Sequence, residues 1–111
     1  MKVEIVEEAD GVSRVIVVGR MDIAGVGVAE QQFNIVAASR KKVIVDFSGV
    51  EFLASLGMRT LVMTAKAVAS KGGRMVLLSP QAGVEKALRT AGLDTIIPIV
   101  ASTDAAASHF S

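Results

Sequence analysis

Ser55 is the side chain in this sequence with the clearest potential for chemistry. It lies between a β-branched run, Val43–Val45, and a segment whose apolar residues recur at helical spacing from Met58 onward. A serine at a strand-to-helix turn can act as a nucleophile, provided that a base lies within reach. The only histidine is His109, close to the C-terminal end of the sequence, so these residues do not favour a serine hydrolase.

Two other roles suit Ser55 from its position alone. It precedes the helical run by three residues, which is typical of an N-cap whose hydroxyl accepts a hydrogen bond from the first turn. The free N–H groups of that turn and the positive end of the helix would also stabilise a phosphate group on the serine. The residues leave both roles open.

Other signals of catalysis or ligand binding are weak. Gly25-Val26-Gly27 has part of the pattern of a phosphate-binding loop, but the third glycine and the acidic partner are missing. The chain has no cysteine, which excludes disulfides, thiol catalysis and thiolate metal sites. We therefore predict that the protein is not an enzyme and has no cofactor and no metal site.

Composition excludes further classes of partner. The formal net charge is +1, and the largest basic cluster is the short Arg40–Lys42 group, so direct binding of nucleic acid is not expected. Tryptophan and tyrosine are absent, which removes stacking platforms for single strands. No apolar run approaches the roughly 20 residues that span a bilayer, and no apolar signal core follows Met1. We expect a soluble cytoplasmic protein without membrane insertion.

The elements that flank Ser55 can be predicted from residue spacing. Val43–Val45 predict a strand that is covered on both faces, as in a parallel sheet. Asp46, Ser48 and Gly49 are expected to end it. An amphipathic helix follows. Its apolar stripe consists of Leu61, Val62, Ala65 and Val68, and Gly72–Gly73 are expected to end it.

The N-terminal segment predicts a β-hairpin and a helix. Val3 and Ile5 belong to a half-exposed strand, which turns at Asp10–Gly11 into a second strand, Val12–Val18. Apolar residues then recur at helical spacing as far as about Ser39.

The C-terminal segment predicts two more strands around a helix. Arg74–Leu78 is a buried strand, and Ser79–Pro80 is expected to supply the N-cap and the first residue of a helix that Gly92 ends. Thr95–Val100 is predicted as a last strand, where Pro98 indicates a sheet edge.

The whole pattern predicts one α/β domain over residues 1–111. Right-handed crossovers would join the strands around residues 15, 45, 76 and 97 into a mostly parallel sheet, with the first strand alone antiparallel. Ser102 and Asp104 favour a short terminal helix. No repeat or linker divides the chain.

The order and spacing of four segments resemble the STAS domain family, and most of all the bacterial anti-sigma factor antagonists. These segments are Gly19–Asp22, the run VIVDFSGVEFLASLGM over Val43–Met58, the Gly72–Gly73 break, and Leu93–Pro98. Together they cover nearly the whole chain. The resemblance implies a STAS-like fold with helices packed on the sheet.

The resemblance also implies a function. In that family the loop commonly reads Asp-Ser-x-Gly, and a kinase that is also the anti-sigma factor phosphorylates the serine. By position, that serine is Ser55 and the glycine is Gly57. The implied mechanism is partner switching, in which the unphosphorylated antagonist binds the anti-sigma factor and frees a sigma factor. The implied partners are an anti-sigma factor with serine kinase activity and a phosphatase.

The partner-binding residues that we predict are Asp22, Ser55, Leu56, Gly57 and Met58. Asp22 matches the acidic residue of the family's Gly-x-x-Asp turn and is expected on the same rim as Ser55, although it is equally suited to cap the first helix. Met58 also has the spacing of a core residue of its helix.

One position departs from the family pattern. The usual aspartate before the serine is replaced by Ala54. This leaves a second hypothesis, in which the domain is a non-phosphorylated STAS adaptor subunit of a signalling or lipid-transport complex.

Overall fold

A five-stranded sheet forms the centre of the molecule. The computed structural model describes residues 1–110, and its strands lie in the order β1-β2-β3-β4-β5. The strands are β1 (Lys2–Glu7), β2 (Val12–Met21), β3 (Lys42–Leu53), β4 (Arg74–Leu78) and β5 (Ile99–Val100). The helices are α1 (Ile23–Ser39), α2 (Ser55–Ser70), α3 (Ala82–Thr90) and α4 (Thr103–Ala107), with short 3₁₀ turns η1 (Ala9–Gly11) and η2 (Leu93–Thr95).

The pairing of the strands confirms the predicted topology. β1 is antiparallel to β2, whereas β2, β3, β4 and β5 pair in parallel. The predicted turn at Asp10–Gly11 is present, and both residues adopt positive φ angles of 63° and 76°. The fold class is therefore α/β with a mostly parallel sheet.

The two central strands are longer than predicted. Asp46, Ser48 and Gly49 do not end β3, which continues to Leu53, and β2 likewise extends beyond Val18 to Met21. The two strands pair along this whole length, with register shifts that absorb the irregular residues. Asp46 accepts hydrogen bonds from the Ser48 N–H (3.0 Å) and hydroxyl (2.7 Å), so these turn-forming side chains are satisfied within the strand.

Two predictions near the C-terminal end are wrong in detail. Gln81, and not Ser79, is the N-cap of α3, because Ser79 adopts a positive φ of 52° and its hydroxyl donates to Ala101 O (3.1 Å). The strand predicted over Thr95–Val100 is reduced to the two residues of β5, since η2 occupies its beginning. The edge position of β5 beside β4 is confirmed. Ser102 caps α4 as predicted, accepting from Ala105 N–H (3.0 Å).

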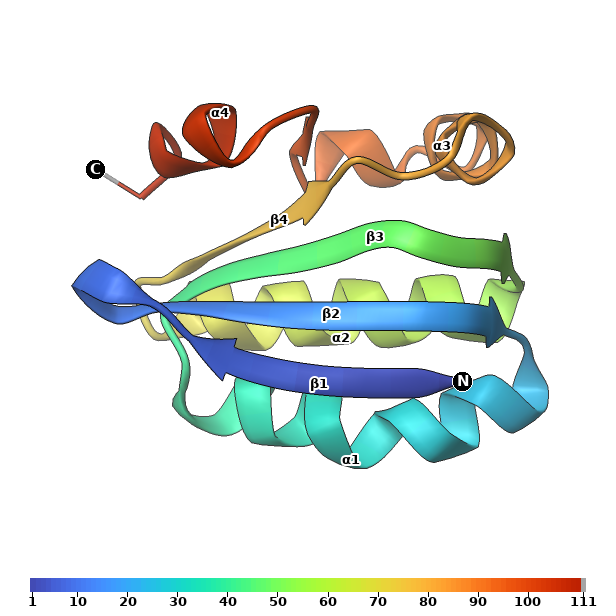
Figure 1. Cartoon of the computed structure of the whole chain (residues 1–111), viewed down its shortest axis with the longest axis horizontal. Coiled ribbons are helices and arrows are strands. Elements are labelled where there is room, and N and C mark those ends of the chain that lie inside the picture. The colour runs from blue at the N-terminus through green and yellow to red at the C-terminus, as the bar shows by residue number, and fades with distance from the viewer. Residues whose placement is uncertain (111) are drawn as a thin grey trace.

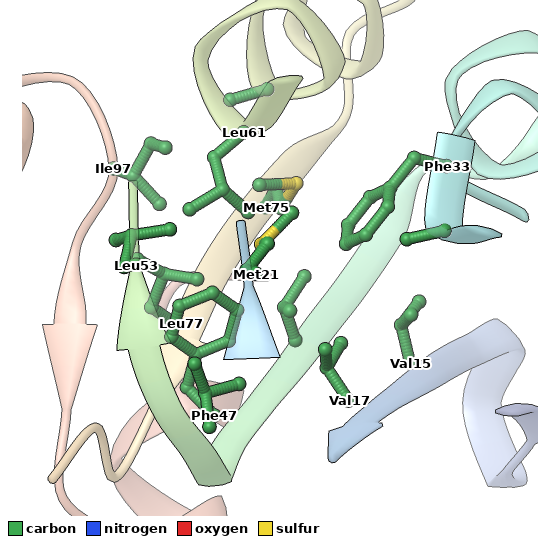
Figure 2. Packing of buried hydrophobic residues seen from close by; sticks show 14 of the residues in the cluster. Val15, Val17, Met21, Phe33, Phe47, Leu53, Leu61, Met75, Leu77 and Ile97 are labelled. Carbon is green, nitrogen blue, oxygen red and sulfur yellow. The ribbon is translucent and has the colours of Figure 1, made fainter. Parts of the chain in front are cut away.

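Helices α1 and α2 cover one face of the sheet, and Figure 1 shows them side by side behind and below the strands. Their apolar residues join the inward residues of β2, β3 and β4 in the main core, part of which Figure 2 shows. Phe33 and Phe47 are the largest fully buried side chains of this cluster. A smaller cluster on the other face includes Ile44, Val76 and Ala106, where α4 packs. The predicted burial of the Val43–Val45 strand on both faces is thus confirmed.

Candidate functional site

The candidate site is a rim where β2 and β3 end and α1 and α2 begin. Met21 and Leu53 are register partners at the ends of the two strands, and the Ala54 N–H donates to Met21 O (3.0 Å). The connections β2–α1 and β3–α2 therefore lie against each other, at the end of the sheet near the N-terminal label in Figure 1. We call this region the Ser55 rim; it comprises residues 20–23 and 52–58.

Ser55 is not the N-cap that its sequence position favoured. Ala54 occupies the N-cap position with extended backbone angles (φ −85°, ψ 166°), and Ser55 is the first residue of α2. Ala54 has no side-chain oxygen, so α2 lacks a side-chain cap. The Ser55 side chain is exposed, which leaves its hydroxyl accessible from solvent.

The start of α2 presents backbone donors beside this hydroxyl. The hydrogen bond from the Met58 N–H to Ala54 O (3.1 Å) closes the first turn of the helix. The N–H groups of Ser55, Leu56 and Gly57 precede it in the ladder and have no acceptor within the helix. Together with the helix dipole, they favour negative charge at this position.

Asp22 is the N-cap of α1, which was one of the two roles predicted for it. Its Oδ1 accepts from the Gly25 N–H (2.9 Å), and the Arg20 Nε lies 3.6 Å from Oδ2. The hydrogen bond from Gly25 is the main cause that lowers the pKa of Asp22; burial opposes it, and the charge of Arg20 adds a further lowering. This carboxylate is thus ionised and held in place on the Ser55 rim.

Gly57 and Met58 face inward more than outward. Gly57 is buried, and a Cβ at this position would lie 2.9 Å from Met21 Cγ and 3.1 Å from Met21 O. The absence of a side chain therefore allows α2 to approach the end of β2 closely. Met58 is partly buried against the main core, in agreement with the alternative that its helical spacing had left open.

Exposed apolar side chains are present at three places on the Ser55 rim. Leu56 is 39% exposed, as expected for a contact residue. Ile23, 77% exposed at the start of α1, and Phe52, 41% exposed at the end of β3, were not predicted. Ile23 falls outside the stripe of buried α1 residues, a signal that the sequence did contain. The exposure of Phe52 could not be inferred while β3 was expected to end earlier.

Arg20 connects these features across the two strands. It is the register partner of Phe52, and its guanidinium carbon lies 4.5 Å from the centre of the Phe52 ring. An arginine at this distance makes a cation–π contact. Together with the Asp22 ion pair, the contact gives the Ser55 rim one exposed cation beside an exposed aromatic ring.

His109 does not lie beside Ser55 and so cannot act as its base. The histidine follows α4 and lines a hollow with Lys41 and Arg74, at the opposite ends of β3 and β4 from the Ser55 rim. Over residues 1–110, no cluster of three or more potential metal ligands is present. In the same range, none of the helices has both the length and the apolarity needed to cross a bilayer.

Comparison with known proteins places this geometry in a family. Residues 5–106 match the STAS domain family. The Bordetella bronchiseptica protein BtrV, whose name assigns it as an anti-sigma factor antagonist, is 27% identical over 70 residues, which are 63% of this chain. The chain spans 60% of the length of that relative.

Solved structures share the whole fold. An anti-sigma factor antagonist from Mycobacterium paratuberculosis has a TM-score of 0.84 and 29% identity, over 96% of this chain and 91% of that chain. The Bacillus cell fate determinant SpoIIAA in its phosphorylated form has a TM-score of 0.72 over 96% of this chain and 98% of that chain. Its 16% identity shows likeness of fold alone. The family match extends from β1 to α4 and includes the Ser55 rim, and with it the resemblance expected from the sequence is confirmed: the chain belongs to the STAS domain family.

Proposed function

We propose that this protein is an anti-sigma factor antagonist that works by partner switching. In its unphosphorylated form it binds an anti-sigma factor through the Ser55 rim, and this releases a sigma factor. The anti-sigma factor is also the kinase that phosphorylates Ser55, and a phosphatase reverses the modification. The chain itself performs no chemistry in this scheme.

The observation that carries the proposal is the exposed Ser55 hydroxyl on the first residue of α2. A phosphate there would add about −1.5 to −2 charges beside N–H groups that have no acceptor within the helix. These donors and the helix dipole stabilise the phosphorylated form within the domain itself. The folded domain would therefore keep its structure while its surface charge changes.

The exposed apolar side chains of the Ser55 rim support a protein contact there. Ile23, Phe52 and Leu56 are all exposed and come from three different elements. An anti-sigma factor that covers them would bring its own surface onto Ser55. Introducing a phosphate into such a contact adds charge that must be desolvated, and a loss of about 2.7 kcal/mol would weaken binding roughly a hundredfold.

Phosphorylation can be tested by intact mass after incubation with the cognate anti-sigma factor and ATP. We expect the mass of one phosphate on the wild type and none on Ser55→Ala. Ser70→Ala, which alters another exposed serine, is the matched control and should still gain one phosphate. If the wild type gains no phosphate from its anti-sigma factor, the switching scheme is wrong and the non-phosphorylated adaptor becomes the better hypothesis.

Measured affinities test whether charge at position 55 changes binding to the anti-sigma factor. Titration calorimetry with the anti-sigma factor should give similar affinities for the wild type and Ser55→Ala, and roughly a hundredfold weaker binding for Ser55→Glu. Leu56→Ala should weaken binding without changing the fold, because this side chain is exposed. Equal affinities of Ser55→Ala and Ser55→Glu would contradict the proposal.

A further inference from the structure

A basic hollow lies at the opposite end of the sheet from the Ser55 rim. Its volume is about 250 Å³, and its charged walls are Lys41 and Lys42 before and at the start of β3, and Arg74 at the start of β4. His109 and Phe110, which follow α4, close one side, and Gly72–Gly73 form another. We call it the basic hollow.

The fold brings these residues together from three separate parts of the sequence. Lys42 and Arg74 are register partners in the parallel pair β3–β4, and the Arg74 N–H donates to Lys41 O (2.7 Å). A Cβ on Gly73 would lie 2.4 Å from Lys41 O, so the α2–β4 turn packs directly against the chain before β3. Phe110 packs on the smaller core cluster, which holds the segment after α4 beside these strands.

Among residues 1–110, the side chains that line the hollow include several cations and no carboxylate. Every ionisable side chain that lines it is a lysine, an arginine or a histidine. Within residues 1–110, none of Lys41, Lys42 and Arg74 forms an ion pair with a carboxylate, and the Lys42 ammonium donates to a backbone oxygen, Asp10 O (3.1 Å). Several arginines elsewhere on the surface do have acidic partners, namely Arg14, Arg20, Arg40 and Arg89.

We propose that the basic hollow binds the phosphate group of a small phosphate monoester. Such a group carries about −1.5 to −2 charges and three acceptor oxygens, which suits a hollow lined by lysine, arginine and histidine side chains better than a single carboxylate does. Arginine and lysine are the side chains that most often hold phosphate. The donors must be side chains, because the nearby N–H groups of Gly72, Gly73 and Arg74 already donate to backbone oxygens.

The aromatic wall indicates that the ligand has an organic part. A volume of about 250 Å³ exceeds that of a phosphate group, since one water occupies about 30 Å³ in the liquid. Phe110 offers an apolar surface beside the cations, and it also lines a second hollow of about 390 Å³ that shares Lys42. A flat or apolar substituent on the phosphate can rest against this ring.

Amide NMR titration at constant ionic strength tests the site, with inorganic phosphate and phenyl phosphate as probes. We expect saturable shifts confined to residues 41–42, 72–74 and 109–110, with phenyl phosphate bound more tightly than inorganic phosphate. Phe110→Ala should remove that difference between the probes. Shifts spread over basic residues throughout the surface, or no saturable binding of either probe, would overturn the proposal.

Two double variants distinguish specific binding in the basic hollow from a general attraction of anions to the positively charged surface. Lys41→Gln with Arg74→Gln removes two cations of the hollow and should weaken phenyl phosphate binding roughly a hundredfold, about tenfold for each charged hydrogen bond lost. Lys66→Gln with Lys86→Gln removes the same charge from exposed helical positions and should leave the affinity unchanged. Equal losses in the two double variants would show that only net charge is sensed, which would also overturn the proposal. The outcome does not depend on whether Ser55 is phosphorylated.

Discussion

Ala54 determines how the start of α2 is stabilised. It occupies the N-cap position but has no side-chain acceptor, so no side chain of the N-cap residue pairs with the first N–H groups of the helix. The aspartate that is usual in the family at this position would supply that acceptor. The departure at Ala54 therefore has a structural consequence for the start of α2.

Restoring an acceptor at position 54 should stabilise the protein. Ala54→Asp is expected to raise the free energy of unfolding by about 1 kcal/mol, since Asp is a favoured N-cap and Ala is not. Urea denaturation at neutral pH measures this change. Ala54→Asn, which caps without a charge, should give a similar gain, whereas no gain from either variant would show that α2 is already capped by another group.

Asp22 makes stability depend on pH at the other helix start. Its pKa is lowered chiefly by the Gly25 N–H, so the native state favours the ionised carboxylate more than the unfolded chain does. The resulting stabilisation is complete above the ordinary Asp pKa of about 4 and is lost as the pH falls through the lowered native value.

A serine at position 22 isolates this contribution. Asp22→Ser keeps an N-cap acceptor but has no titrating group. The difference in unfolding free energy between wild type and Asp22→Ser should be larger at pH 7 than at about pH 3. Urea denaturation at the two pH values measures it, and a difference that does not change with pH would contradict the assignment.

At the scale of elements, two glycines in the first turns of α1 differ in whether the structure leaves room for a side chain. A Cβ on Gly25 would lie 2.0 Å from Arg20 O, because the start of α1 packs against the end of β2. A Cβ on Gly27 would meet nothing within 4 Å. The helix therefore needs a glycine at only one of the two positions.

Alanine substitutions at these positions should change stability in opposite directions. Gly25→Ala is expected to lower the free energy of unfolding by about 1–3 kcal/mol or more, through the clash with backbone. Gly27→Ala should raise it by up to about 1 kcal/mol, since alanine favours the helix and restricts the unfolded chain. Thermal or urea unfolding measures both, and equal effects of the two substitutions would contradict the close approach at Gly25.

At the scale of the whole molecule, the sheet order sets which strands are protected. β3 lies between β2 and β4 and contributes fully buried residues such as Val43, Val45 and Phe47. β5 has two residues and pairs only with β4. The Ser55 rim and the basic hollow lie at the two ends of β3. Figure 1 shows the course of this strand through the sheet.

Native-state hydrogen exchange should reflect this arrangement. Amides in the middle of β3 are expected to exchange only through global unfolding, whereas the amides of β5 open locally and exchange faster. Mass spectrometry or NMR under native conditions can measure the two rates. Comparable protection of β3 and β5 would contradict the sheet order.

Local sequence was sufficient to predict most of the elements. Consecutive β-branched residues and helical spacing depend on the chain alone, and they identified every α-helix and strand in the correct order, although not the two 3₁₀ turns. The position of Ser55 between a buried strand and a helix, and the capping role of Asp22, follow from the same local rules. The lengths of β2 and β3 could not be predicted from local sequence. Pairing between distant segments continues these strands through turn-forming residues such as Asp46 and Gly49.

The sequence by itself determined the STAS fold and the candidate serine, because the fold follows from the order and spacing of segments along the chain, and the serine from its place between a predicted strand and a predicted helix. Only the tertiary structure decided the surroundings of that serine. The extended β3 carries Phe52 to the rim, β2 brings Arg20 to its ring, and Ala54 takes the N-cap position so that Ser55 is exposed. The basic hollow has the same origin, since parallel pairing joins Lys42 to Arg74, which lies 32 positions later in the sequence, and no local pattern contains this contact.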